Sequence, residues 1–188
     1  MMNQVDLPVA LTENLEKLLE DISKEKHNKK CIFAERYEKD NKDSQYYLSN
    51  EFLLNKNIVD ISEYKRLFNI ITAYPDTENL EKFLKERNFE LFEKNVSGFF
   101  YYPPDGFMSW HTNYKRNDWR IYIVKSLEGD SFFRYVKDGE IITEYDPKGW
   151  SYRIFYVGDE SNPFWHCVNG GSGRYSIGFR LKKIKDTL

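Results

Sequence analysis

Two histidines, His111 and His166, are the residues whose type and spacing point most directly to chemistry. They lie far apart in a part of the chain where polar and apolar side chains alternate as they do in β-strands. A neutral imidazole nitrogen is the commonest protein ligand for transition metals. The pair therefore predicts one metal site, provided that the fold brings the two rings together. The third histidine, His27, stands in a polar stretch, where we expect solvent exposure.

The residues around His111 fit one kind of metal site in their spacing. Non-haem Fe(II) oxygenases hold iron by two histidines and one carboxylate, and they leave the other coordination positions open. His111 is followed two residues later by Asn113, which stands where that pattern has a carboxylate, and His166 fits the second histidine. Asp105 and Asp118 are carboxylates in nearby loops, but neither has the usual spacing.

Asn113 leaves three alternatives open, because an amide oxygen is neutral and a weaker ligand than a carboxylate. It could bind metal through its oxygen or through a water molecule. It could leave a coordination position free for another ligand. The site could also have lost its metal.

Arg174 and Ser176 supply a second chemical element eight to ten residues after His166. Alternation places both side chains on the same face of one strand. A guanidinium group binds a carboxylate through two parallel hydrogen bonds, and a hydroxyl can add a third. The pair therefore predicts a site for a buried carboxylate, the alternative being that Arg174 only bridges a surface carboxylate.

The elements that position these residues are mostly short strands in the second half of the chain. Turn sequences separate them, among them Pro103-Pro104-Asp105-Gly106 and the hairpin signal Lys137-Asp138-Gly139. Many short strands at close spacing favour a barrel or a jelly roll over a βαβ sheet.

The first half of the chain has helical spacing of apolar residues. We expect a helix capped by Thr12, a second helix from Ser62 to about Ala73, and a third capped by Thr77. Residues 31–34 are compatible with a short strand.

Residues 98–182 resemble the 2-oxoglutarate/Fe(II)-dependent dioxygenase superfamily, and they look most like its small stand-alone members from bacteria and their viruses. The matching pieces, in order, are His111-x-Asn113, Pro147-Lys148-Gly149 before a strand, His166, and Arg174-x-Ser176. In some halogenating members a small residue replaces the carboxylate ligand and admits chloride. Nothing in residues 1–90 contributes to the resemblance.

The resemblance implies a role for each site residue. His111, Asn113 and His166 would form the catalytic metal site for Fe(II). Arg174 and Ser176 would bind the distal carboxylate of the cosubstrate 2-oxoglutarate, and Tyr122 would face the same pocket. The implied activity is hydroxylation of an unknown substrate, with release of succinate and CO2.

The fold expected on these grounds is mainly β with N-terminal helices. We predict a single domain, 1–188, in which a double-stranded β-helix (jelly roll, cupin-like) over 96–188 packs against a helical support segment over 1–95.

Composition narrows the possible partners and the location. A net charge of −2 offers no basic field for a polyanion, so there is no strong nucleic-acid signal. The two cysteines do not form a disulfide framework, and the chain shows neither a signal peptide nor an apolar run long enough to cross a membrane. We expect a cytoplasmic protein, in a bacterium or in the host cell of a phage, without a membrane partner. The substrate stays open among small metabolites, amino acids, peptide side chains and nucleobases.

Two other functions compete with the dioxygenase. One is a catalytically degenerate double-stranded β-helix that binds a carboxylate ligand or a partner protein. The other is a cupin-like metalloenzyme that uses a different metal without 2-oxoglutarate. Near the site, Trp110 and Trp165 are either core residues or part of a substrate mouth. We expect Arg134 and Arg153 to be charges on strand faces, the alternative being that they hold the substrate.

Overall fold

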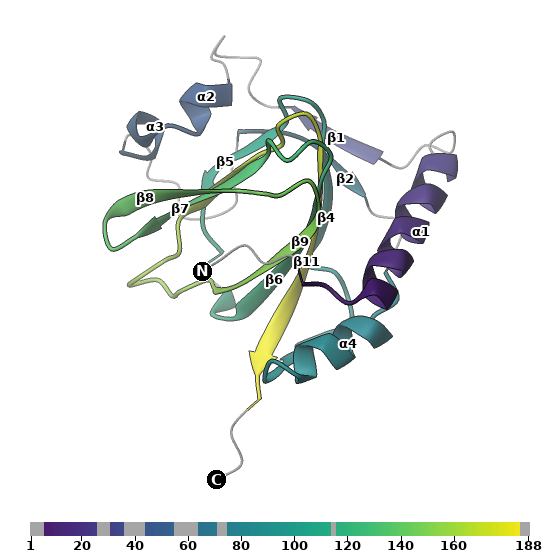
Figure 1. Cartoon of the computed structure of the whole chain (residues 1–188). Helices are drawn as coiled ribbons and strands as arrows, with labels where there is room; N and C mark the ends of the chain where they lie inside the picture. Colours follow the sequence, from purple (N-terminus) through teal and green to yellow (C-terminus); the bar gives the residue numbers. More distant parts are fainter. Residues whose placement is uncertain are drawn as a thin grey trace.

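The computed structural model describes residues 6–25, 31–35, 44–54, 64–70, 75–113 and 116–184. Most of these residues belong to a strongly curled antiparallel sheet with helices on its outside (Figure 1). The strands are β1 (Cys31–Glu35), β2 (Lys65–Ile70), β3 (Phe89–Leu91), β4 (Gly98–Tyr102), β5 (Phe107–His111), β6 (Trp119–Ser126), β7 (Phe132–Lys137), β8 (Glu140–Tyr145), β9 (Gly149–Tyr156), β10 (His166–Asn169) and β11 (Arg174–Lys183).

The order of the strands identifies the fold as a double-stranded β-helix. Along the sheet the order is β8-β7-β10-β5-β2-β4-β11-β6-β9, with β1 added to β2 and β3 added to β11. From β4 onward most connections cross from one half of this order to the other. As a result β4, β6, β9 and β11 form one wall, and β5, β7, β8 and β10 form the other. The predicted jelly-roll class is confirmed.

Alternating side chains fill the space between the two walls. Tyr102, Phe133, Phe155 and Val168 come from four different strands and belong to one buried cluster. Because successive residues of a strand point to opposite faces, the same strands also carry polar side chains into this interior. The candidate site is built from those side chains.

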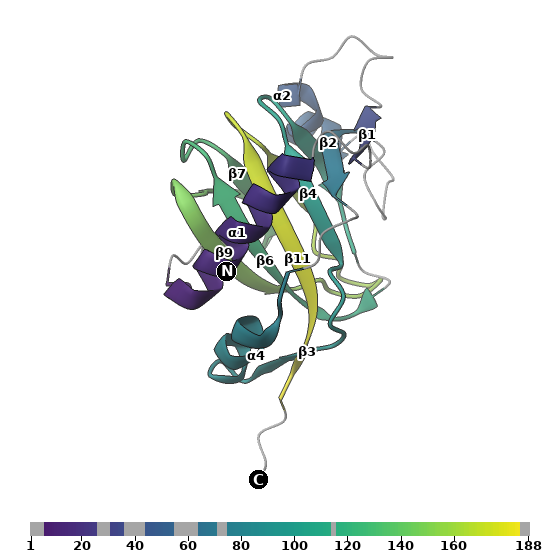
Figure 2. The same ribbon diagram turned by 90° about the vertical axis from the view of Figure 1, so that its right-hand side faces the viewer.

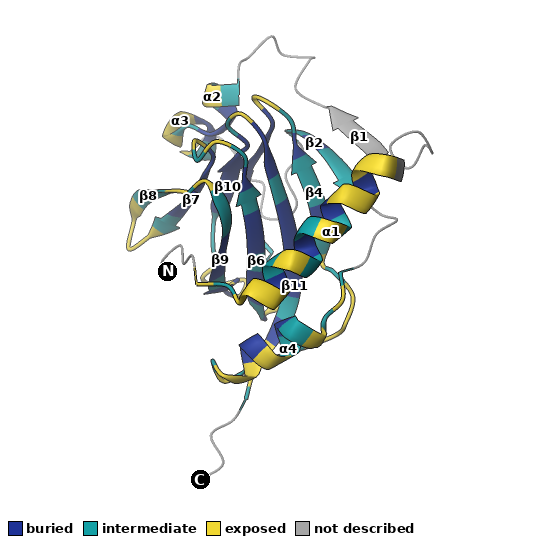
Figure 3. Ribbon diagram, turned by 45° about the vertical axis from the view of Figure 1, so that its right-hand side comes forward, coloured by how far each residue is buried: buried dark blue, intermediate teal, exposed yellow. Residues whose placement is uncertain are grey.

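Helices cover the outer faces of the walls. They are α1 (Val9–Glu25), α2 (Ser44–Tyr47), α3 (Asn50–Leu54) and α4 (Glu78–Lys85). α1 and α4 lie across the outside of β11 and β6 (Figure 2). The buried stripe of α1, which includes Leu11, Leu15 and Leu19, faces this sheet while its other side is exposed (Figure 3).

The predicted helix from Ser62 to about Ala73 is wrong over its described part. Residues 65–70 form β2, which pairs with β1, β4 and β5. Tyr64, Leu67 and Phe68 have helical spacing, but hydrogen bonds to three other strands outweigh that local pattern. The strands β1, β2 and β3 all lie within residues 1–95. This part of the chain therefore adds strands to the sheet as well as helices that cover it.

The start of the first helix also differs from the prediction. α1 begins at Val9, directly after Pro8, and the hydroxyl of Thr12 donates to the Val9 carbonyl within the first turn. Proline is well suited to a helix start because it has no amide hydrogen to leave unpaired. The helix predicted after Thr77 does begin there, although the Thr77 hydroxyl bonds Glu81 and caps no backbone group.

Two local predictions are confirmed. The strand at 31–34 is β1, and the hairpin turn joins β7 to β8 at Asp138 and Gly139, with φ values of 52° and 80°. Positive φ at both positions matches the right-handed twist of the flanking strands. None of the helices in the described part of the chain has the length and apolar character that crossing a membrane requires.

Candidate metal and carboxylate site

The fold brings His111 and His166 together. β5 and β10 pair antiparallel, and these two residues stand directly opposite each other in the ladder. Their ring centroids are 4.1 Å apart and the rings are tilted by 55°. The long separation in sequence is therefore closed by the two neighbouring strands that carry them.

Backbone hydrogen bonds determine which ring nitrogen of each histidine is free. Nδ1 of His111 lies 2.8 Å from the Ser109 carbonyl oxygen, and Nδ1 of His166 lies 3.0 Å from the Phe164 carbonyl oxygen. A carbonyl can only accept, so in each neutral ring Nδ1 carries the hydrogen and Nε2 keeps its lone pair. Nε2 of His166 is buried and has no hydrogen-bond partner within the described part of the chain. Two neighbouring imidazoles that each keep an Nε2 lone pair are suited to bind a metal ion.

Burial keeps both rings neutral. It lowers the pKa of His111 to about 4, despite the hydrogen bond to Ser109. Burial lowers the pKa of His166 well below its usual value as well, and the neighbouring His111 adds to that effect. At neutral pH no proton competes for either Nε2 atom.

Aromatic rings hold His166 in place. Phe133 stacks on its ring at 5.2 Å, Phe164 stacks at 5.5 Å, and Phe155 meets it edge-on at 5.7 Å. These contacts restrict the ring's orientation and keep water from that side.

Asn113 completes the group at the end of β5. Its side chain hydrogen-bonds Tyr122, whose pKa is raised by burial, against the opposing charges of Arg120 and Arg174. Within the described ranges, no group of three or more His, Cys, Asp or Glu side chains could hold a metal ion. The ligand set predicted from the sequence, two imidazoles and one amide, therefore contains no carboxylate.

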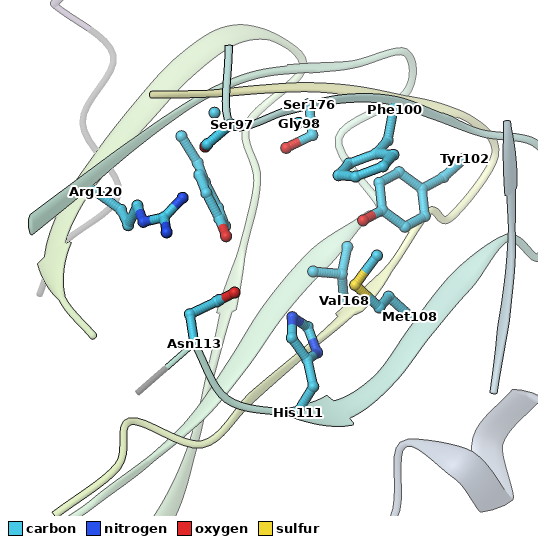
Figure 4. Close-up of a pocket in the computed structure, with 12 residues that line it drawn as sticks. Ser97, Gly98, Phe100, Tyr102, Met108, His111, Asn113, Arg120, Val168 and Ser176 are labelled. Atoms are coloured by element: carbon cyan, nitrogen blue, oxygen red, sulfur yellow. The ribbon is translucent and has the colours of Figure 1, made fainter. Parts of the chain in front are cut away.

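A partly open cavity of about 120 Å³ lies beside these residues (Figure 4). His111 and Asn113 stand along one wall, and Arg120 and Tyr102 lie on opposite sides of the space. The other lining residues are Ser97, Gly98, Phe100, Met108, Tyr122, Val168, Ser176 and Gly178. Of the sequence-predicted site residues, His111, Asn113, Tyr122 and Ser176 thus share one cavity, with His166 against His111.

Arg174 is placed differently from these residues. It is fully buried behind Tyr102, whose ring lies 5.4 Å from its guanidinium carbon, and it does not line the cavity. Its Nε donates to Oδ2 of Asp146 at 2.9 Å, while Nη1 and Nη2 have no hydrogen-bond partner among the described residues. The guanidinium is held along one edge and keeps two unpaired nitrogens.

Asp146 joins Arg174 to a second buried arginine, Arg153. Nη2 of Arg153 donates to Oδ1 of Asp146 at 2.6 Å, and the Ser131 hydroxyl donates to Oδ2 at 2.8 Å. Burial raises the pKa of the Asp146 carboxyl, but the charges of Arg174 and Arg153 outweigh it and hold the pKa well below its usual range. Glu144 adds a further negative charge in the neighbourhood of Arg153.

Sequence reasoning missed this cluster. Arg153 was expected on a strand face, yet it is completely buried. Asp146 directly precedes the Pro147-Lys148-Gly149 turn, and no local pattern distinguishes it from an exposed turn residue.

Arg120 is a further functional candidate that sequence reasoning missed. It is 5% exposed, lines the cavity, and donates from Nε to Oδ1 of Asp118 at 2.9 Å. A signal was present, because Arg120 and Tyr122 alternate on one strand and therefore share a face. Asp118 also accepts a hydrogen bond from Arg180, so this carboxylate is already paired, and Asp105 is exposed in its turn.

The two tryptophans beside the histidines have different environments. Trp110 is buried among Tyr47 and Phe52, and its Nε1 donates to the Ser49 carbonyl at 2.9 Å. Trp165 is half-buried and borders a larger surface hollow of about 650 Å³. His27 lies outside the described residues.

Comparison with known proteins gives distant structural likenesses only. No protein-family profile matches the sequence, and no curated protein matches it. A prolyl-4-hydroxylase from Pseudomonas putida aligns over 96% of this chain and 91% of its own, with 15% identity and a TM-score of 0.49. An oxidoreductase of the 2OG-Fe(II) oxygenase family from Burkholderia pseudomallei aligns over 88% and 78%, with 11% identity and a TM-score of 0.48.

A cupin domain is also similar. The Drosophila melanogaster CENP-C cupin domain aligns over 95% of this chain and 100% of its own, with 9% identity and a TM-score of 0.35. At these scores none of the likenesses carries an argument. The fold and the candidate site rest on the strand pairing and side-chain geometry of this chain.

Proposed function

We propose that this chain is an Fe(II)- and 2-oxoglutarate-dependent dioxygenase that hydroxylates a small substrate. The observation that carries the proposal is the pairing of His111 with His166. Both rings have Nδ1 engaged by a backbone carbonyl, and both keep Nε2 for a metal.

His111, His166 and the amide oxygen of Asn113 would hold the iron. The unpaired, buried Nε2 of His166 fits this assignment, because a buried polar atom without a partner is costly unless a ligand satisfies it. When bound, Fe(II) with 2-oxoglutarate supplies the oxidising power for attack on a C–H bond, with succinate and CO2 as coproducts.

Arg174 and Ser176 would bind the distal carboxylate of 2-oxoglutarate. Nη1 and Nη2 of Arg174 are unpaired donors, and Asp146 fixes the guanidinium through the opposite edge. Tyr102 lies between Arg174 and the cavity, so its side chain would have to turn aside or join the carboxylate contacts. A carboxylate bound here would meet charge-assisted hydrogen bonds, which are the strong ones.

The remaining residues of the cavity would exclude water and orient the reactants. Phe100, Met108 and Val168 provide apolar walls, and the phenyl rings around His166 close its far side. A dry site strengthens each electrostatic contact inside it.

Anaerobic titration with Fe(II) and 2-oxoglutarate tests the proposal. The wild-type chain should develop the visible charge-transfer band of an iron-chelated 2-oxo acid, and it should form succinate when oxygen is admitted. His111→Ala should abolish both signals because the metal loses one ligand. Arg174→Ala should abolish succinate formation at moderate 2-oxoglutarate concentrations.

Folding has to be checked for both variants, because Arg174→Ala leaves Asp146 without one partner. Circular dichroism and thermal unfolding separate loss of the site from loss of the fold. If the folded wild-type chain gives no band at saturating iron and 2-oxoglutarate, the dioxygenase proposal is wrong.

One observation favours a second function, a β-helix that binds a carboxylate ligand without catalysis. Asn113 supplies no negative charge, and the third ligand is the weakest member of the set. Stabilisation by 2-oxoglutarate in the absence of any metal, together with no iron retained after dialysis, would support this second function.

A further inference from the structure

We propose that the substrate carries a carboxylate and that Arg120 binds it at the end of the cavity opposite Tyr102. This inference rests on the proposed function and adds the chemical class of the substrate. It depends on the orientation of Arg120, on the charge of the cavity lining, and on the distance between Arg120 and Arg174.

Arg120 is held so that its outer edge faces the cavity. Its Nε donates to Asp118, which Arg180 anchors from the other side. Figure 4 shows the guanidinium of Arg120 directed into the cavity. In the described part of the chain, the Arg120 side chain makes one hydrogen bond, from Nε to Asp118. Its terminal nitrogens, Nη1 and Nη2, therefore have no hydrogen-bond partner there.

The cavity has a positive lining. Arg120 is the only formally charged side chain among the described residues that border it, and no Asp or Glu is among them. Asn113, in place of a carboxylate, removes the negative charge that would otherwise face Arg120 across the site. A nearly buried guanidinium edge without a partner therefore favours an anionic guest.

This guest is distinct from the cosubstrate carboxylate. Arg120 pairs with Arg180 in the β6–β11 ladder, whereas Arg174 pairs with Ser126 at the other end of β6. The two positions are six residue steps apart along β6, which corresponds to roughly 20 Å. Tyr122 lies between these positions on the same face of β6 and hydrogen-bonds Asn113, so we expect a substrate at Arg120 and a cosubstrate at Arg174 to reach the proposed metal site from opposite sides.

The space at Arg120 suits a small acid. Gly178 borders it, and a Cβ there would come within 2.9 Å of the Ser97 hydroxyl oxygen and 3.0 Å of the Tyr122 ring, so this wall is closely packed. The two terminal nitrogens of a guanidinium present parallel N–H groups, which match the two oxygens of a carboxylate. With about 120 Å³ available, the guest is a small molecule, and a polymer could place only its end here.

Butyrate and butyramide are matched probes, because they have the same shape and differ in charge. We expect the full-length wild-type chain to bind butyrate at least about tenfold more tightly than butyramide, measured by ligand-observed NMR titration. Arg120→Gln should reduce this ratio to about twofold or less, and Arg120→Lys should retain part of it because the charge stays. Thermal unfolding of each variant shows whether the fold is intact.

Arg116→Gln is the control variant. Arg116 is exposed and lies close in sequence, so the substitution removes the same net charge without touching the cavity. Its butyrate-to-butyramide ratio should stay within about twofold of wild type, because exposed charges are screened. Equal ratios in Arg120→Gln and wild type, or a wild-type chain that does not distinguish the probes, would overturn the proposal. Inorganic phosphate binding more tightly than butyrate would overturn the carboxylate assignment.

Repeating the titration in the presence of Fe(II) and 2-oxoglutarate separates this inference from the proposed function. Butyrate should still bind, and 2-oxoglutarate should not displace it. Displacement, or loss of the charge-transfer band in folded Arg120→Gln, would assign Arg120 to the cosubstrate and overturn the inference. If the chain binds butyrate through Arg120 but forms no charge-transfer band, the proposed function is wrong and the anion site at Arg120 is still supported.

Discussion

At the level of single residues, Asn113 decides how much negative charge the protein itself would contribute to the proposed metal site. The two histidines are neutral, since burial lowers the pKa of each. A divalent ion held by His111, His166 and an amide would keep its full charge. The cosubstrate and other anions would then have to supply the negative charge that balances the metal ion.

Asn113→Asp should raise the affinity for Fe(II) by roughly tenfold or more, because it replaces a neutral donor by a charged one of the same size. Competition with a colorimetric chelator under anaerobic conditions measures the change. Asn113→Ala is the comparison and should weaken binding. If neither substitution alters the affinity, residue 113 is not a ligand.

At the level of elements, the cluster around Asp146 joins three parts of the roll. Arg153 comes from β9, Arg174 begins β11, and Ser131 precedes β7. Ser131 and the three charged side chains are all buried. Solvent therefore screens the charges of Asp146, Arg153 and Arg174 only weakly. Removing the one carboxylate would leave two arginines without their shared partner.

Asp146→Asn should lower the free energy of unfolding by about 3–5 kcal/mol at neutral pH, as the loss of one member of a buried ion pair does. The pKa of Asp146 is lower in the folded chain than in the unfolded chain. Its stabilising contribution is therefore present above a pH of about 4 and is lost as the pH falls below that value. Urea unfolding from neutral to acidic pH should show a shallower acid-side decline in the variant.

Asp138→Asn is the matched control for this experiment. Asp138 is exposed in the β7–β8 turn with a φ of 52°, a conformation that asparagine adopts equally well. We expect its unfolding free energy to stay close to wild type. If Asp146→Asn also left the free energy of unfolding close to wild type, the buried cluster would contribute little to stability.

At the level of the whole molecule, α1 and α4 complete the core on the outside of the roll. Leu15 is 1% exposed and belongs to a cluster with Ile121, Ile177 and Phe179 of the strands. The same strands carry Tyr122 and Ser176 on their inner face. The packing of α1 thus supports the wall from which the site residues project.

Leu15→Ala should therefore lower the free energy of unfolding by about 2–5 kcal/mol, the usual cost of a cavity at a buried leucine. Val9→Ala, in the same helix but 71% exposed, should change it little. Urea denaturation of the two variants beside wild type measures the difference. Equal stabilities would mean that α1 is not part of the cooperative fold.

The sequence by itself determined the class of fold and the order of the candidate site residues. Short alternating segments, Gly/Pro turns and the Asp138-Gly139 hairpin are local features, and the turn residues set their own backbone conformation without distant partners. Alternation also placed Arg174 with Ser176, and it would have placed Arg120 with Tyr122, because the side-chain period of a strand is two.

Only the tertiary structure decided which side chains meet. It made residues 65–70 a strand between β5 and β4, brought the rings of His111 and His166 to 4.1 Å, paired Arg174 with Asp146, and turned Arg120 toward the cavity. Strand pairing and the neutralisation of buried charge depend on partners far away along the chain. No window of sequence contains those partners, so the chemistry of the site became definite only in the folded roll.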